Sequence, residues 1–272
     1  MPRTPSLTQV STVDGAALAA QSPIVFLHIP KTAGQTIHNA LAAMVGRKHV
    51  SPIRTHTQAQ GAQARQMPEG YALYSGHIDW TELDRLPKGR FTFTVLRDPR
   101  ERIASFYFFL LKEAEALDAE ALNQPQNYGK KLILQRSAED YFFGGPDHFK
   151  TFILDHYDNF YTSYLATRKM RGRPELKDLS IADRIAQARA NAAQIDRIYP
   201  ISGLGGLERD IAGRFGGQIS VAETYHNAGP MAREQSRWPK LLNRMATDQG
   251  RAALEAFAAA DLELMSSLGV AL

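Results

Sequence analysis

The chain has 272 residues, of which 44% are hydrophobic, so it can bury a core of ordinary size. It contains no cysteine, which excludes a disulfide framework and a thiolate metal site. A formal net charge of +4 favours anionic ligands, whereas nucleic-acid binding would call for a concentrated basic face. The sequence shows no membrane-spanning stretch and no hydrophobic signal core, so we expect a soluble, cytoplasmic protein.

The order of apolar and polar segments predicts an α/β fold. Residues 1–21 are polar and rich in small side chains, so we expect a flexible N-terminal arm followed by a single domain over residues 22–272. Strands alternating with helices indicate a central, mainly parallel sheet flanked by helices, with ligands at the carboxyl ends of the strands. Strands are predicted at residues 24–29, 72–75, 91–96 and 198–202, and helices at about 37–45, 99–117, 180–194, 207–215 and 246–268. Short aromatic helices and turns are expected over residues 118–177.

The turn Pro30–Thr36 lies between the first predicted strand and its helix, and it contains Lys31 and Gly34. A helix N-terminus offers unpaired N–H groups and the positive end of the helix dipole, and a lysine adds a mobile charge. The order of lysine and glycine in this turn differs from that of the Walker A phosphate-binding loop, G-x-x-x-x-G-K-[ST]. Here Lys31 precedes Gly34, which is the only glycine of the turn. The turn therefore predicts a site for a phosphate-like group; the alternative is an ordinary solvated connection.

A second anion site is predicted where the strand over residues 91–96 runs into the next helix. Arg97 follows this strand, Asp98 and Pro99 suit the start of a helix, and Ser105 lies on that helix. An arginine fork and a hydroxyl can hold a phosphate, so we expect a ligand with two separated anionic groups. The alternative is a structural ion pair between Arg97 and Asp98.

His77 is the candidate general base. It follows Gly76 at the carboxyl end of a predicted strand, where an acceptor would approach. An ordinary imidazole pKa of about 6.5 lets it accept a proton near neutral pH. The alternative is a structural histidine at the end of a strand.

Basic residues elsewhere are candidates for binding the acceptor. Arg168, Lys169, Arg171 and Arg173 lie within six residues of one another. They could bind a carboxylated or sulfated glycan, although a solvated basic loop is the favoured alternative. Weaker candidates are Arg54, His56 and Lys112.

The segments IPKTAGQT and TVLRDPRERIASFYFF resemble the two donor-binding motifs of sulfotransferases that use 3′-phosphoadenosine 5′-phosphosulfate. The likeness is closest to the carbohydrate branch that includes heparan sulfate 2-O-sulfotransferases. It implies a three-layer, P-loop-like fold. The eukaryotic members in the Golgi lumen carry an N-terminal membrane anchor, and the departure of this sequence from that pattern leads us to expect a soluble, bacterial-type, cytoplasmic enzyme. The resemblance implies that the 5′-phosphosulfate is bound by Lys31, Thr32, Ala33, Gly34, Gln35 and Thr36. It likewise implies that the 3′-phosphate is bound by Arg97 and Ser105. His77 matches the catalytic histidine of that branch, although Ser75 stands where those enzymes have another histidine.

Sulfuryl transfer to a hydroxyl resembles in-line phosphoryl transfer, in which the protein mainly positions the groups and stabilises charge. Lys31 would stabilise the leaving 3′-phosphoadenosine 5′-phosphate and His77 would take the hydroxyl proton. The transferred group carries less charge than a phosphoryl group, so no metal is expected. Two alternatives stay open: a P-loop-like small-molecule kinase and a non-catalytic nucleotide-binding module.

Overall fold

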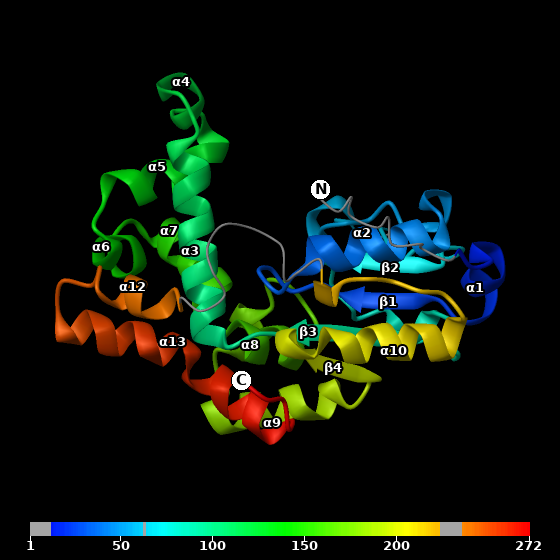
Figure 1. The fold of residues 1–272 in the computed structure, drawn as a ribbon. Helices are drawn as coiled ribbons and strands as arrows, with labels where there is room; N and C mark the ends of the chain where they lie inside the picture. The colour runs from blue at the N-terminus through cyan, green and yellow to red at the C-terminus, as the bar shows by residue number, and fades with distance from the viewer. Residues whose placement is uncertain (1–11, 62–63, 224–235) are drawn as a thin grey trace, which may run out of the picture. The chain divides into compact units, whose positions relative to one another are not determined.

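A computed structural model describes residues 12–61, 64–223 and 236–272 of the protein (Figure 1). The chain divides into two compact units: the first comprises Met1–Leu96 and Ala193–Pro230, and the second Arg97–Ala192 and Met231–Leu272. Each unit is assembled from two separate stretches of sequence. The expectation of one domain over residues 22–272 stays a prediction, because compact units can belong to one domain.

The first unit contains a four-stranded parallel sheet in the order β2-β1-β3-β4. Its strands are β1 (Ile24–Leu27), β2 (Leu73–Gly76), β3 (Phe91–Leu96) and β4 (Arg197–Pro200). Every residue of β1, β2 and β3 is buried, as in strands covered on both faces. The register pairs Leu27 with Gly76 and with Thr94, so the carboxyl ends of these three strands meet at one edge.

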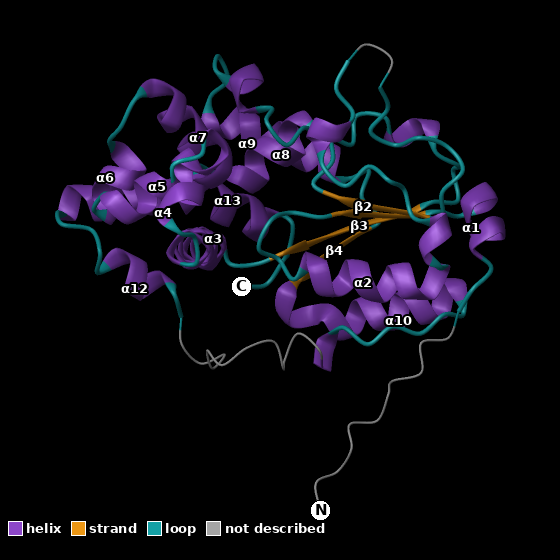
Figure 2. Cartoon of the chain, turned by 90° about the horizontal axis from the view of Figure 1, so that it is seen from above, coloured by secondary structure: helices purple, strands orange, loops and turns teal. Residues whose placement is uncertain are grey.

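Helices of the first unit flank this sheet. They are α1 (Gly15–Gln21), α2 (Gly34–Val45) and α10 (Leu204–Phe215), with 3-10 turns at Arg47–His49, His56–Gln58, Leu83–Arg85 and Ile201–Gly203. Figure 2 shows α2 and α10 on the same face of the sheet. The predicted α/β fold with a central parallel sheet flanked by helices is confirmed.

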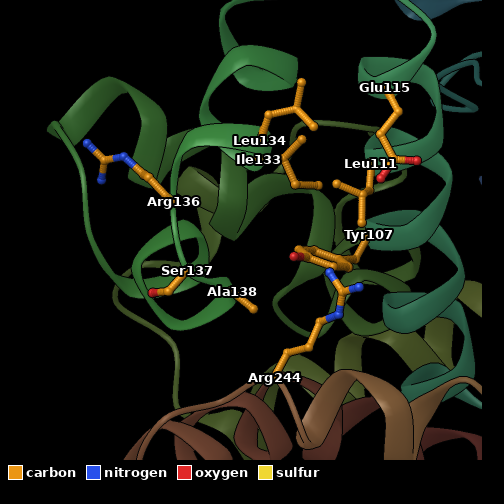
Figure 3. A pocket seen from close by; sticks show the side chains of 9 residues that line it. All are labelled: Tyr107, Leu111, Glu115, Ile133, Leu134, Arg136, Ser137, Ala138 and Arg244. Atoms are coloured by element: carbon orange, nitrogen blue, oxygen red, sulfur yellow. The ribbon is translucent and has the colours of Figure 1, made fainter.

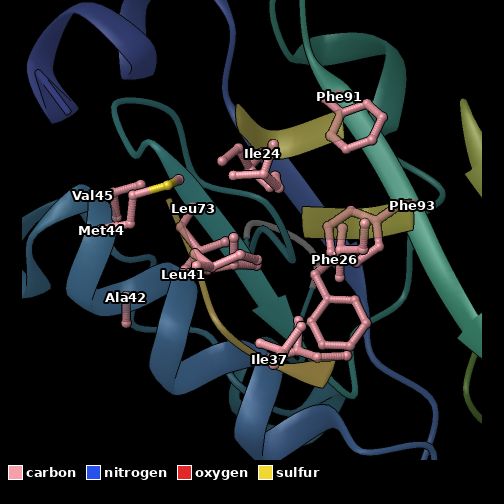
Figure 4. Packing of buried hydrophobic residues seen from close by; sticks show 14 of the residues in the cluster. Ile24, Phe26, Ile37, Leu41, Ala42, Met44, Val45, Leu73, Phe91 and Phe93 are labelled. Atoms are coloured by element: carbon pink, nitrogen blue, oxygen red, sulfur yellow. The ribbon is translucent and has the colours of Figure 1, made fainter. Parts of the chain in front are cut away.

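The core of the first unit holds the start of α2 at the edge of the sheet. Phe26 of β1 stacks on Phe93 of β3 with ring centroids 4.8 Å apart, and Ile37 and Leu41 of α2 belong to the same cluster (Figure 4). All four side chains are buried, and full burial of one such side chain stabilises the fold by about 1.5–3 kcal/mol. This packing places the N-terminus of α2 next to the carboxyl end of β1.

The structure corrects the expected arm over residues 1–21. Residues 1–11 lie outside the described part of the chain, but Gly15–Gln21 form α1. The Asp14 carboxylate accepts hydrogen bonds from the N–H groups of Ala16 and Ala17. We missed this N-cap, which together with an alanine-rich sequence is sufficient to start a helix that packs on the rest of the unit.

The second unit consists of helices and turns, with no strand among its described residues. Its helices are α3 (Pro99–Glu115), α4 (Ala119–Leu122), α5 (Tyr128–Gln135), α6 (Ala138–Phe143), α7 (Asp147–Tyr157), α8 (Phe160–Thr167), α9 (Ile181–Ala192), α12 (Trp238–Leu242) and α13 (Asp248–Ser267). The turns Pro125–Asn127 and Arg173–Leu176 are 3-10 helical. Within the described residues, no helix combines the length and apolar composition that crossing a membrane requires.

Candidate functional site

The loop between β1 and α2 has the backbone geometry of an anion-binding turn. Lys31 and Ala33 both have positive φ, at 74° and 64°, and Thr32 lies between them without positive φ. Alternating conformations of this kind turn successive N–H groups toward one side, as in anion-binding nests. Each positive φ at a residue with a side chain costs about 1–2 kcal/mol, a strain that is common at binding sites.

The start of α2 leaves further donors available. Its N-cap is Ala33, which has no side chain able to accept a hydrogen bond, and the first N–H groups of a helix have no intrahelical partner. Thr32 is fully buried, and its Oγ1 donates to the carbonyl oxygen of Ile29 at 2.9 Å, which ties the loop to the end of the strand. The turn and the start of α2 thus offer main-chain N–H donors at the carboxyl end of β1, and the phosphate site there stays a prediction.

Gly34 is required by packing, since its φ is not positive. A Cβ at this position would lie 1.6 Å from Nε2 of His28, so the imidazole ring of His28 occupies the space of the missing side chain. That ring stacks on Phe26 and lies 4.3 Å, centroid to centroid, from the ring of His77. His28 therefore lies between the anion loop and the predicted base.

A hydrogen bond to His28 orients His77. Nδ1 of His77 lies 2.7 Å from the main-chain carbonyl oxygen of His28, and because a carbonyl only accepts, Nδ1 carries the proton. The lone pair of neutral His77 is therefore on Nε2. Burial lowers the pKa of His77 below the ordinary 6.5, although the bond to His28 opposes this effect. His77 is thus neutral and able to accept a proton at neutral pH.

The segment over residues 50–56 runs alongside β2 and brings two predicted acceptor residues to His77. The N–H of His77 donates to the carbonyl oxygen of Arg54 at 2.8 Å, and the N–H of His56 donates to the carbonyl oxygen of His77 at 2.7 Å. A Cβ at Gly76 would lie 2.2 Å from the Arg54 carbonyl oxygen, so this close approach requires glycine. Arg54 and His56 therefore flank the candidate base.

His38 of α2 is a member of the same cluster that sequence reasoning missed. Its Nε2 accepts a hydrogen bond from Nη1 of Arg54. Burial, followed by the charge of Arg54, lowers the pKa of His38 to about 4, and burial likewise holds the pKa of His28 well below its ordinary value. No local motif marks His38, because its partner is 16 positions away in the sequence.

The second predicted motif belongs to the second unit. Nη2 of Arg97 lies 3.2 Å from a carboxylate oxygen of Glu101, and both side chains are mostly buried. The hydroxyl of Tyr161 donates to the carbonyl oxygen of Arg97, which holds its main chain. The alternative of an Arg97–Asp98 ion pair is wrong, because Asp98 caps α3 and pairs with Arg100. Ser105 lies on α3 and is partly buried.

The other predicted acceptor residues also belong to the second unit. Lys112 is exposed on α3, Arg171 is exposed, and Arg168 ends α8 with a φ of 61°. Ion pairs neutralise two neighbours of these arginines: Arg173 with Asp158 and Lys169 with Glu175. Part of this run of basic residues is therefore already engaged in ion pairs with carboxylates of the protein.

The helices of the second unit also form a pocket of about 410 Å³, which contains none of the predicted residues. Its lining residues, shown in Figure 3, are Tyr107, Leu111, Glu115, Ile133, Leu134, Arg136, Ser137, Ala138 and Arg244. The guanidinium of Arg244 lies 5.9 Å from the centre of the Tyr107 ring. No group of three or more histidine, aspartate or glutamate side chains in the described residues is arranged to hold a metal ion.

A parallel sheet whose first strand leads through a positive-φ loop into a helix N-terminus is an arrangement typical of α/β proteins that bind phosphate-like groups. The chain belongs to the sulfotransferase family, whose model matches residues 15–247. A comparison with curated proteins found no match. Family membership confirms that the protein is a transferase of sulfuryl groups with a hydroxyl-bearing acceptor.

Proposed function

We propose that the protein transfers a sulfuryl group from 3′-phosphoadenosine 5′-phosphosulfate to a hydroxyl of a carbohydrate. The observation that carries the proposal is the arrangement of His77, whose basic Nε2 is set by the bond of Nδ1 to His28, a residue that also packs on the anion loop. A base and an anion site joined through one residue are suited to group transfer onto a hydroxyl. The carbohydrate acceptor rests on the resemblance of the two motifs.

The anion loop suits the 5′-phosphosulfate of the donor. Lys31 and the N–H groups of residues 32–36 would hold its oxygens, because the positive φ values turn those groups to one side and α2 begins there. Arg97 and Ser105 are proposed to hold the 3′-phosphate. Among the described residues only Nη2 of Arg97 contacts Glu101, so the other N–H groups of the guanidinium can donate to a phosphate.

The residues divide the chemistry between them. Nε2 of His77 accepts the proton of the acceptor hydroxyl as the hydroxyl oxygen bonds to sulfur. The bond from sulfur to the bridging oxygen of the 5′-phosphate breaks, and its electron pair stays on the departing bisphosphate. Lys31 neutralises that charge, while the loop N–H groups stabilise the equatorial oxygens. Arg54 and His56, together with Lys112, Arg168 and Arg171, are proposed to bind the acceptor.

Calorimetric binding of 3′-phosphoadenosine 5′-phosphate tests the proposal, with ATP and adenosine 5′-phosphosulfate as competing ligands. We expect wild type to prefer the bisphosphate and Arg97→Ala to lose that preference by roughly 10- to 100-fold, as for hydrogen bonds to charged groups. Arg100→Ala is the matched control, because it removes a neighbouring arginine that pairs with Asp98.

Preference for ATP, or indifference to the 3′-phosphate, would contradict the assigned donor and favour a kinase. A wild type that binds the donor but transfers nothing to any hydroxyl acceptor would favour the non-catalytic module.

A further inference from the structure

Arg54 is a partly buried cation without a carboxylate partner among the residues that the structure describes. Its one side-chain hydrogen bond to a described residue goes from Nη1 to the neutral imidazole of His38, and the same burial lowers the pKa of Arg54. Burying a charge without a counter-charge is costly, so such a group is retained only where something compensates for it. An anionic ligand would supply that compensation.

The bond to His38 also selects which edge of the guanidinium stays available. Nη1 is engaged, while Nε is buried and makes no hydrogen bond to any described residue. The edge formed by Nε and Nη2 is one that binds two oxygens of a carboxylate, sulfate or phosphate at once. His38 thus fixes the rotation of the fork and leaves its bidentate edge with a buried Nε that has no partner among the described residues.

Two histidines close to Arg54, its partner His38 and its near neighbour in sequence His56, also have unsatisfied polar atoms. Both ring nitrogens of His56 and Nδ1 of His38 are buried and have no partner in the described chain. Buried polar atoms are almost always hydrogen-bonded in folded proteins. Several such atoms without a partner therefore indicate a place where a ligand or water completes the hydrogen bonds. The cluster adjoins His77, whose N–H donates to the carbonyl oxygen of Arg54.

We propose that Arg54, oriented by His38, is an oxyanion-binding residue beside the base. Two sources could supply the oxyanion: the sulfuryl group that is transferred, or an acidic group on the acceptor. Oxyanion binding by Arg54 stands on its contacts alone, whereas its part in catalysis rests on the proposed function.

Titration with inorganic sulfate, followed by the imidazole NMR signals of isotope-labelled histidine, tests the site. We expect a saturable shift of the His38 signal in wild type and in Arg65→Gln, a control that removes an exposed arginine paired with Glu69. In Arg54→Gln the affinity should fall by roughly 10- to 100-fold. No shift of His38 in wild type, or an equal shift in Arg54→Gln, would overturn the proposal.

Two further variants separate orientation from charge. His38→Phe retains a ring but removes the acceptor for Nη1 together with the reporter imidazole, so sulfate binding to this variant is followed through the signal of His77, whose N–H donates to the Arg54 carbonyl oxygen. Its sulfate affinity should fall although Arg54 is present. Arg54→Lys keeps the charge and loses the fork, so it should also bind more weakly. Wild-type affinity in both variants would show that a bidentate, oriented guanidinium is not what binds the anion.

Calorimetry with the donor and with 3′-phosphoadenosine 5′-phosphate identifies the source of the oxyanion. If Arg54→Gln weakens the donor but not the bisphosphate, Arg54 binds the transferred group. If both affinities are unchanged while sulfate binding is lost, Arg54 binds an acidic group of the acceptor. Equal weakening of both would overturn the proposal, because Arg54 would then act through the anion loop. A wild type that binds neither nucleotide would contradict the proposed function and leave the sulfate result standing.

Discussion

One hydrogen bond determines which nitrogen of His77 is basic. The carbonyl oxygen of His28 accepts from Nδ1, so a proton taken from an acceptor must go to Nε2. The same arrangement explains why His28 is itself a poor candidate for the base: it is 8% exposed, and burial holds its pKa well below the ordinary value. The two neighbouring histidines are therefore proposed to have different roles, His77 as the base and His28 as the residue that orients it.

The pH dependence of transfer should reveal His77 as the base. Burial lowers the pKa of His77, so its active neutral form predominates from a pH below the ordinary 6.5 upward. We expect kcat/KM to rise with pH through that lowered pKa and to be level at neutral pH. His77→Gln should lower kcat by roughly 10²- to 10⁴-fold while bisphosphate affinity is unchanged. A rate that rises only above pH 7 would exclude this assignment.

Gly34 offers a test of the packing between His28 and the anion loop. A Cβ at Gly34 would meet the His28 ring at 1.6 Å, so Gly34→Ala should displace either the ring or the loop. We expect a loss of about 1–3 kcal/mol in the free energy of unfolding and a tenfold or larger loss of bisphosphate affinity. Both are measured on the purified variant, by urea unfolding and by calorimetry.

Gly213→Ala is the matched control, because a Cβ there meets nothing within 4 Å inside α10. It should stabilise the protein by about 0.5–1 kcal/mol and leave ligand binding unchanged. Equal bisphosphate affinity in the two variants would mean that His28 does not control the shape of the loop.

At the scale of elements, α13 caps the start of α8. The carboxylate of Asp261 on α13 accepts hydrogen bonds from the N–H groups of Tyr161 and Thr162 and from the hydroxyl of Thr162, all within 3.0 Å. Asn159 adds another hydrogen bond between the start of α8 and α13, since its side-chain oxygen accepts from the N–H of Ala260 at 2.8 Å. The two helices are therefore joined by side chains about 100 positions apart in the sequence.

This buried carboxylate should make stability depend on pH. Burial raises the pKa of Asp261 from the ordinary 3.8 to about 6, so the folded protein holds a proton that the unfolded chain releases between these values. The contribution of Asp261 to the free energy of unfolding should therefore fall as pH rises from about 4 to 6, by roughly 3 kcal/mol. Chemical denaturation across that range measures the effect.

Asp261→Asn should remove this pH-dependent part. It should also destabilise the protein at every pH, because its amide nitrogen cannot accept a hydrogen bond and one of the two main-chain N–H groups loses its acceptor. Asp183→Asn is the control, since Asp183 is exposed at the start of α9. If the two variants followed the same pH curve, Asp261 would not titrate as burial requires.

At the scale of the whole molecule, each unit is built from two separate stretches of sequence. Neither unit is a continuous piece of sequence that could be excised. We therefore expect a single cooperative unfolding transition in calorimetry, with equal calorimetric and van't Hoff enthalpies. The bisphosphate at 100 times its Kd should stabilise the folded protein by about 2.7 kcal/mol. Two separate transitions would contradict the single domain.

The sequence by itself determined the strand, turn and helix around Lys31, the start of α3 at Asp98 and Pro99, and the cap of α9, where Ser180 accepts from the N–H of Asp183. These features depend on residues within one or two turns of each other, so their signals lie in short stretches of sequence. The N-cap of α1 at Asp14, which we missed, is also a local feature, so the sequence was sufficient to predict it.

Only the tertiary structure decided how the base and its neighbours are held. The bond that orients His77 spans 49 positions, the contact that orients Arg54 spans 16, and the approach of residues 50–56 to β2 depends on the missing side chain of Gly76. Contacts of this kind form when the sheet brings distant segments to one edge. No short sequence pattern records them, because each partner alone is an ordinary histidine, arginine or glycine.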